Sequence, residues 1–277
     1  MSLVAAIQMV SGTHLDDNLK TAAGLLQTAA NGGAKLAVLP ENFALLDSPA
    51  LHPLAEQEER EGVIRRFLAE QARKLGLWIV AGSVPMATRP NLALVDGERI
   101  RAACLVVDDQ GELQARYDKV HLFDVQVADA HGSYKESSLC EPGEELVVVD
   151  TPVGKLGLTI CYDLRFPEQF QRLREMGAEL ISVPSAFTYV TGQAHWEVLL
   201  RARAIETQCY LIGADQGGSH SATRETWGQS MVVKPDGQIA DQLARGAGVV
   251  FSRVDLVGLA ELRAKMPVFA HRQQAGF

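Results

Sequence analysis

Short apolar runs of strand length alternate with amphipathic segments of helix length along most of the chain. Residues 3–8 and 35–39 predict strands, and residues 16–30 predict the helix between them. Hairpin signals interrupt this alternation, most clearly within residues 103–117, where a turn is expected at 109–111. Alternating strands and helices favour an α/β fold, and the hairpins indicate mixed sheets rather than purely parallel ones.

Further along the chain, we expect a single strand over 77–84 and a helix over 195–207. Residues 123–145 have no clear period, and connections of that length are often functional. No linker, internal repeat or low-complexity tract divides the 277 residues, so a single domain over 1–277 is the simplest interpretation.

The formal net charge of the chain is -8. Nucleic acids and anionic membranes bind proteins through basic surfaces, so this balance argues against either as the main partner. The apolar runs are far shorter than the roughly 20 residues of a membrane span, and we find no signal peptide. Four cysteines without CxxC spacing indicate reduced thiols and a cytoplasmic location.

Cys161 is the cysteine placed most favourably for chemistry. It ends the apolar run 155–160 and precedes a predicted helix that begins at Pro167. A side chain at such a turn lies at the carboxyl edge of the sheet, where backbone N–H groups can face an oxyanion. The nearby helix N-terminus is expected to favour the thiolate. A buried packing cysteine is the commoner alternative, and it suits Cys104 and Cys209 within their apolar strands.

A thiol nucleophile requires a base, and none of the seven histidines has an obvious partner pattern. Two other charged residues stand directly after predicted strands. Pro40 removes Glu41 from its strand, and Lys119 follows the strand that ends near Tyr117. Each of them, taken alone, could equally be a solvated side chain.

Taken together, these segments resemble the nitrilase superfamily of carbon–nitrogen hydrolases. The similarity lies in Pro40-Glu41, in Tyr-x-Lys-x-His-Leu over 117–122, and in Ile-Cys-Tyr-Asp-Leu-Arg-Phe-Pro-Glu over 160–168. It implies a four-layer α-β-β-α sandwich with two mixed sheets. It also implies a homodimer in which helix layers pack together, including the helix that begins near Pro167.

The resemblance assigns a role to each matched residue. Glu41 would be the general base, and Cys161 would form a thioester with release of ammonia or an amine. Lys119 would stabilise the oxyanion together with the backbone N–H of Tyr162. Glu136 matches a second glutamate of many members and would orient Lys119 or the substrate, although a solvated loop carboxylate is the alternative. No metal or cofactor is implied.

Residues 184–187, 191–197 and 201–210 are similar to the Nit branch of the superfamily, which includes deaminated glutathione amidases and ω-amidases. The similarity implies a small carboxamide substrate, with deaminated glutathione expected first. The open alternatives are ω-amidase action on α-ketoglutaramate or succinamate, N-carbamoyl amino acid hydrolysis, and a non-catalytic binding member.

Four residues are predicted to contact the substrate, namely Tyr162, Arg165, Phe187 and Trp196. Arg165 could hold a substrate carboxylate, because such a group requires a cation or a cluster of N–H donors. Its structural alternative is a salt bridge with Glu168 or with a helix neighbour. Two further arginines, Arg201 and Arg203, are expected to form structural pairs on a helix with Glu197 or Glu206.

Overall fold

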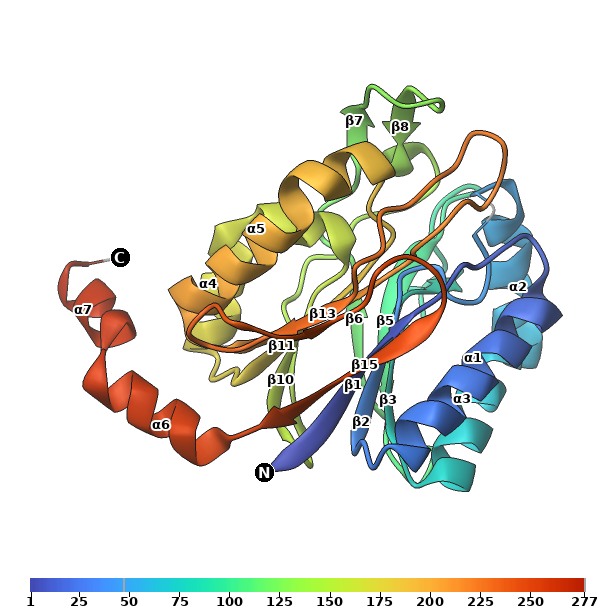
Figure 1. The fold of residues 1–277 in the computed structure, drawn as a ribbon. Helices are drawn as coiled ribbons and strands as arrows, with labels where there is room; N and C mark the ends of the chain where they lie inside the picture. Colours follow the sequence, from blue (N-terminus) through green and yellow to red (C-terminus); the bar gives the residue numbers. More distant parts are fainter. Residues whose placement is uncertain (47, 277) are drawn as a thin grey trace.

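Strand β1 (Ser2–Gln8) is buried on both of its faces, and this explains the layered architecture. Successive side chains of a strand point to opposite faces of the sheet. Val4 and Ala6 belong to one hydrophobic core, while Ala5 and Ile7 belong to another. A sheet with two apolar faces must be covered on both sides. The computed structural model, which describes residues 1–46 and 48–276, provides this cover with four layers (Figure 1).

The first sheet has the strand order β15-β1-β2-β3-β5-β4, with β6 paired to β5. Strands β1, β2 and β3 run parallel to one another, whereas the remaining neighbours are antiparallel. The further strands of this sheet are β2 (Leu36–Leu39), β3 (Trp78–Ala81), β4 (Val84–Met86), β5 (Arg101–Val107), β6 (Leu113–Asp118) and β15 (Gly248–Val254).

The second sheet has the order β14-β13-β12-β11-β10-β9 and is parallel only across its three central strands. Its strands are β9 (Val148–Thr151), β10 (Gly154–Leu158), β11 (Leu180–Ser185), β12 (Tyr210–Asp215), β13 (Met231–Val233) and β14 (Ile239–Gln242). Strand β12 packs against β1 and β2, so the two sheets face each other across the central core. A separate hairpin of β7 (Asp124–Gln126) and β8 (Ser133–Lys135) projects from one end (Figure 1).

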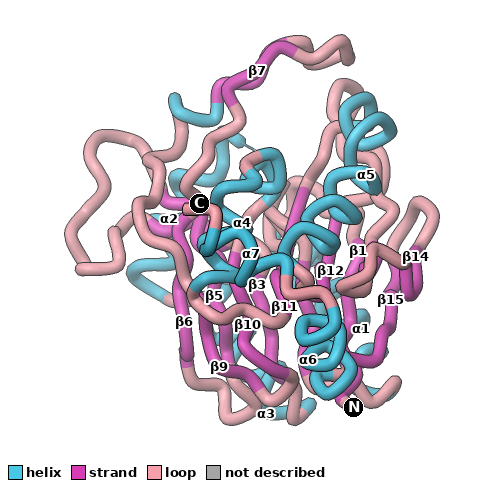
Figure 2. The backbone as a smooth tube through the Cα atoms, turned by 90° about the vertical axis from the view of Figure 1, so that its left-hand side faces the viewer, coloured by secondary structure: helices cyan, strands magenta, loops and turns pink. Residues whose placement is uncertain are grey.

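Helices cover the outer face of each sheet. The first sheet carries α1 (Leu15–Asn31), α2 (Leu51–Glu61) and α3 (Val63–Leu75), and the second carries α4 (Pro167–Glu175) and α5 (Tyr189–Thr207). The chain ends with α6 (Leu256–Lys265) and α7 (Val268–Gln274), which run along the outside of the second helix layer (Figure 2). The predicted four-layer α-β-β-α sandwich with two mixed sheets is therefore confirmed. Among the described residues, no helix has the length and apolar character to cross a bilayer.

Three elements differ from the prediction. Helix α2 lies in a stretch too rich in glutamate to be recognised; Glu58 is buried there because its carboxylate accepts the N–H groups of Ile64 and Arg65 at the start of α3. The expected strand 77–84 divides at Gly82, which has φ +42 and approaches the Pro40 carbonyl so closely that a Cβ would clash. Helix α5 begins six residues before His195, because Thr188 caps its first turn.

Leu26→Ala should destabilise the fold by about 2–5 kcal/mol, because Leu26 is fully buried between α1 and the first sheet and its removal leaves a cavity. Denaturant unfolding followed by circular dichroism would measure this loss. Lys20→Ala on the exposed face of the same helix is the matched control and should change stability by less than about 0.5 kcal/mol. Equal effects of the two substitutions would contradict the placement of α1.

Candidate active site

The three segments of the sequence motif meet at one end of the sandwich. Glu41 follows β2, Lys119 follows β6 directly, and Cys161 lies shortly after β10. Lys119 Nζ donates to Glu41 Oε1 at 2.8 Å and to both carboxylate oxygens of Glu136 at 2.9 Å. Glu41, Lys119, Glu136 and Cys161 all line the same cavity. The structure thus brings together side chains that lie up to 120 residues apart in the sequence.

One ammonium group shared by two carboxylates gives this cluster a net negative charge. Burial by itself lowers the pKa of Lys119, but the charges of Glu136 and Glu41 outweigh it and raise that pKa well above its usual value. Burial and the charge of Glu41 raise the pKa of Glu136, against the opposite effect of Lys119. Lys119 therefore remains charged, and its orientation is fixed from two sides.

Cys161 opens a short 3-10 turn over Cys161–Arg165, and its backbone has φ +50. This left-handed conformation is uncommon for a residue with a side chain and must be held by its surroundings. The Asp163 side chain holds it, because Asp163 Oδ2 accepts the N–H of Ile160 at 2.8 Å. The turn directs the Cys161 thiol into the cavity.

The thiol is not in a thiolate-favouring environment, contrary to the prediction from the nearby helix N-terminus. Burial and the negative charge of Glu41 raise the pKa of Cys161 well above its usual value. Lys119 and the backbone amide of Ala186 act in the opposite direction but do not outweigh these effects. Cys161 therefore rests as a neutral thiol and requires a base at the moment of attack.

Asp163 also joins the Cys161 turn to the segment that carries Lys119. Its Oδ1 accepts the N–H of His121 at 3.1 Å and contacts His121 Nδ1 at 2.8 Å. The Tyr117 hydroxyl donates to Asp163 Oδ2 at 2.6 Å and accepts the N–H of Val120 at 3.2 Å. The His121 ring stacks on Phe166 with centroids 3.6 Å apart. Two of the three motif segments are thus fixed to one buried carboxylate.

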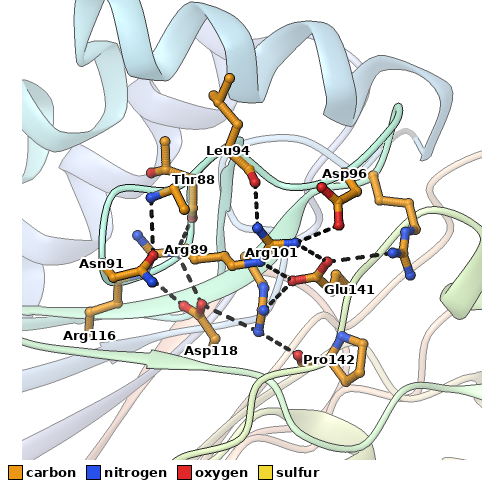
Figure 3. A network of polar contacts seen from close by, with 12 residues as sticks. Thr88, Arg89, Asn91, Leu94, Asp96, Arg101, Arg116, Asp118, Glu141 and Pro142 are labelled. Carbon is orange, nitrogen blue, oxygen red and sulfur yellow. Dashed lines mark hydrogen bonds and ion pairs between the residues drawn. The ribbon is translucent and has the colours of Figure 1, made fainter.

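An ionic network secures the strand that precedes Lys119 (Figure 3). Arg116 Nε pairs with Asp118 Oδ1 at 2.7 Å, and Arg89 Nε pairs with Glu141 Oε1 at 2.7 Å. Arg101 lies between them, because it pairs with both acids and donates to the Pro142 carbonyl. The side-chain hydrogen bond from Arg89 contributes most to lowering the pKa of Glu141 to about 2. The network anchors the backbone on either side of the catalytic region.

The cavity has a volume of about 560 Å³, enough for a small ligand. Tyr162, Arg165 and Phe187 line it, and their contact with a substrate stays a prediction. Trp196 does not lie among the described lining residues, so its prediction as a substrate contact needs correction. Its side chain is fully buried on the inner face of α5, where Nε1 donates to the Gln229 carbonyl at 2.9 Å. It supports Phe187 from behind, with ring centroids 5.0 Å apart.

Arg165 lies in the cavity without a carboxylate within 4.0 Å among the described residues. Its expected alternative, a salt bridge with Glu168 or with a helix neighbour, is therefore not formed among these residues. The guanidinium instead contacts His195 Nδ1 at 3.1 Å and lies 5.3 Å from the Phe187 ring centroid and 5.8 Å from that of Tyr162. The other two arginine pairs are as predicted: Arg201 with Glu197 at 3.1 Å and Arg203 with Glu206 at 3.0 Å.

Sequence reasoning missed two residues at the end of β12 that hold cavity segments in place from behind. Asp215 is fully buried and accepts the N–H groups of Phe187 and Gly228, each at 3.0 Å. The Gln216 side chain donates to the Glu41 carbonyl at 3.1 Å. Asp215 is the last residue of β12 and Gln216 follows it, so both carry the strand-end signal that drew attention to Glu41 and Lys119. Within the described residues, no group of three or more His, Cys, Asp and Glu side chains is arranged to hold a metal ion.

Comparison with known proteins places this geometry in a family. The family model "Carbon-nitrogen hydrolase" matches residues 3–264. The chain belongs to the carbon–nitrogen hydrolase family. It is therefore a hydrolase that acts on carbon–nitrogen bonds, and the resemblance to the nitrilase superfamily is confirmed.

Individual relatives share most of the chain. A deaminated glutathione amidase from Yersinia enterocolitica is 46% identical over 98% of this chain and 92% of its own length. The NitFhit protein of Caenorhabditis elegans superposes with a TM-score of 0.90 at 37% identity over 100% of this chain, which spans 66% of that protein's chain. A mutant amidase from Nesterenkonia sp. AN1, with acrylamide added at its active-site cysteine, superposes with a TM-score of 0.78 at 26% identity. The match covers 99% of this chain and 100% of that amidase's chain.

The pH dependence of Cys161 ionisation tests the electrostatics of the cavity. Because the folded-state pKa of this thiol lies well above 9.0, Cys161 should carry no thiolate around neutral pH. The difference in far-ultraviolet thiolate absorbance between the native chain and Cys161→Ser should be flat there and rise only in alkaline solution. A titration complete below pH 8 would contradict the buried, Glu41-facing environment of the thiol.

Proposed function

We propose that the chain is a cysteine amidase in which Glu41, Lys119 and Cys161 are the catalytic residues. The observation that carries the proposal is the convergence of a buried thiol, a carboxylate and a fixed ammonium in one cavity. A neutral thiol with a raised pKa needs a base, and Glu41 is the carboxylate that acts on it. Lys119 is the cation whose charge opposes the rise in the thiol pKa. The same ammonium can stabilise the negative charge that develops on the substrate oxygen during attack.

The proposed reaction has two halves. Glu41 takes the proton of the thiol as Cys161 Sγ attacks the amide carbon, and Lys119 Nζ with the backbone N–H of Tyr162 stabilises the oxyanion. The carbon–nitrogen bond breaks as Glu41 returns the proton to the departing nitrogen, leaving a thioester on Cys161. Glu41 then takes a proton from water, whose oxygen attacks the thioester carbon. The carbon–sulfur bond breaks, and Glu41 returns the proton to Cys161 Sγ, which releases the acid and restores the thiol. Two moderate barriers replace one high barrier.

Glu136 is proposed to position Lys119 rather than to transfer protons. Both of its oxygens are engaged by Lys119 Nζ, and Oε2 also accepts the N–H of Phe123 at 2.6 Å. These contacts leave Glu136 as a fixed counter-charge at the base of the hairpin β7–β8. The same contacts argue against the alternative of a solvated loop carboxylate.

Deaminated glutathione is the substrate we propose, and its support is the Yersinia enterocolitica relative that carries this activity in its name. Its acyl half ends in an α-keto acid, so a carboxylate lies near the scissile amide. Arg165, unpaired among the described residues and placed beside Cys161, suits that carboxylate. Phe187, Tyr162 and His195 hold the guanidinium in place. The group released from this substrate is the amine of cysteinylglycine, whereas ammonia would leave only from a terminal carboxamide.

Trapping the acyl-enzyme tests both the nucleophile and the substrate. With deaminated glutathione, mass spectrometry of the quenched protein should find an α-ketoglutaryl group on Cys161, and α-ketoglutarate should accumulate in solution. Cys161→Ala should abolish the adduct, and Glu41→Gln should lower kcat by at least about 100-fold because the base is lost. Cys140→Ala, which changes a neighbouring cavity cysteine, is the matched control.

The alternatives give different products in the same experiment. Ready turnover of α-ketoglutaramate or succinamate with none of deaminated glutathione would favour an ω-amidase. Release of carbon dioxide together with ammonia would indicate N-carbamoyl hydrolysis. Activity that survives Cys161→Ala would remove the proposed mechanism.

We also propose a homodimer formed through the helix layer of the second sheet. Val190, Val198 and Ile205 of α5 are 40%, 66% and 52% exposed, and the latter two lie seven residues apart on one helix face. An exposed apolar stripe on an amphipathic layer suits a second copy of the chain. Helix α4, which begins at Pro167, packs beside α5 and would border the interface.

Val198→Asp should convert the dimer to monomer, because it places a charge at the centre of the stripe. Sedimentation velocity would measure the change, with circular dichroism to confirm the fold. Leu113→Asp, an exposed position on β6 at the other side of the molecule, is the control and should leave the dimer intact. A native chain that sediments as a monomer at micromolar concentration would refute the proposal.

Two simpler proposals follow from the chain as a whole. We propose that residues 1–277 act as a single carbon–nitrogen hydrolase domain, because both sheets supply residues to one cavity. We further propose a cytoplasmic location, supported by four cysteines that are buried as free thiols.

A further inference from the structure

A second arginine, Arg224, lines the cavity together with Arg165. It belongs to the loop between β12 and β13, which sequence analysis did not single out. Its guanidinium carbon lies 4.9 Å from the Tyr134 ring centroid, and Nη2 donates to the Ala186 carbonyl at 3.4 Å. Ala186 is the residue whose backbone amide acts on the Cys161 thiol. Arg224 therefore reaches from the outer loop to the immediate neighbourhood of the nucleophile.

Arg224 forms no ion pair within 4.0 Å across residues 1–46 and 48–276. Arg224 is among the groups that lower the pKa of Asp129 on the hairpin β7–β8, but this carboxylate is engaged elsewhere. Its Oδ2 accepts from the Tyr134 hydroxyl at 2.9 Å, and its Oδ1 accepts the N–H groups of His131 and Gly132. Beyond its bond to the Ala186 carbonyl, the Arg224 guanidinium therefore keeps most of its five N–H donors available to a ligand.

Arg245 also lies over a tyrosine, with its guanidinium carbon 5.1 Å from the Tyr189 ring centroid. Unlike Arg224, it pairs with Glu225 at 2.6 Å. Stacking on an aromatic ring therefore does not require the guanidinium to be left without a carboxylate. Arg224 combines this aromatic contact with a position on the cavity wall and no carboxylate partner among the described residues, which points to an anionic ligand.

We propose that Arg224 binds a carboxylate on the leaving half of the substrate. The acyl half remains attached to Cys161 beside Arg165, whereas the leaving amine must depart through the cavity mouth. Arg224 lies at that mouth, next to the exposed lining residues Ser221 and Thr223. This inference rests on the proposed amidase function and names its class of leaving group, an amine that carries a carboxylate a few bonds from its nitrogen.

Two arginines at one cavity then divide the recognition between them. Arg165 selects for an anionic acyl group, and Arg224 selects for an anionic amine. A planar guanidinium binds a carboxylate through two parallel hydrogen bonds, which makes the contact directional as well as attractive. Removing such a charged contact is expected to cost about 10- to 100-fold in kcat/KM.

A pair of substrates separates this role from a structural one. The first is deaminated glutathione, and the second is its C-terminal glycinamide, which has the same shape without the leaving-half carboxylate. The native enzyme should prefer the first by about 10- to 100-fold in kcat/KM. Arg224→Gln should reduce that ratio to about one, while Arg245→Gln, the control, should keep the native ratio. Release of α-ketoglutarate measures the rates of the native enzyme and of both variants on each of the two substrates.

The outcomes distinguish failure of this inference from failure of the proposed substrate. Equal losses on both substrates for Arg224→Gln, or a native ratio near one, would overturn the role of Arg224 even if deaminated glutathione is hydrolysed well. If the native enzyme does not hydrolyse deaminated glutathione, the substrate proposal fails. The same comparison is then made with succinyl-cysteinylglycine and its glycinamide, where a ratio that does not depend on Arg224 overturns the inference.

Discussion

The buried contact of Lys119 with Glu41 and Glu136 is the interaction on which the active site depends. Burying an unpaired charge is costly, so the single ammonium and its two carboxylates stabilise one another only while all three stay in place. The three residues come from the end of β2, the end of β6 and the hairpin region after β6. Both the first sheet and the long connection of residues 123–145 must therefore be correctly folded before this cluster can exist.

Burial and the negative charge of Glu41 together set the protonation state of Cys161, the proposed nucleophile. Both raise the pKa of this thiol, so Cys161 keeps its proton until a base removes it. Asp163 supplies a second, separate anchor, because it holds the Cys161 turn and the segment after Lys119 at once. The first cluster governs charge in the cavity and the second governs geometry. Neither contact alone would align Cys161 with Lys119.

The convergence of Glu41, Lys119 and Cys161 could be predicted from the resemblance of their three segments to one family. Strand ends alone do not give it, because Cys161 follows a strand of the second sheet and the other two residues follow strands of the first. The misplacement of Trp196 has a different origin. Its helix begins earlier than expected, at Tyr189, and the sequence alone does not reveal which helix face meets the sheet. The thiolate expectation failed because it weighed only the local helix, and neither the burial of the thiol nor the charge of Glu41, 120 residues away in the sequence. Arg224 could not be found because its loop carries no periodic pattern.

The left-handed backbone at Cys161 also restricts how this active site can change over evolution. A serine has the same branching at Cβ as cysteine and can occupy φ +50 at similar strain. Threonine cannot do so readily, since a β-branched side chain at positive φ is a severe outlier. The turn therefore excludes one of the three common hydroxyl and thiol nucleophiles by its shape, before any difference in chemical reactivity is considered. Lineages that inherit this turn are confined to nucleophiles with an unbranched side chain.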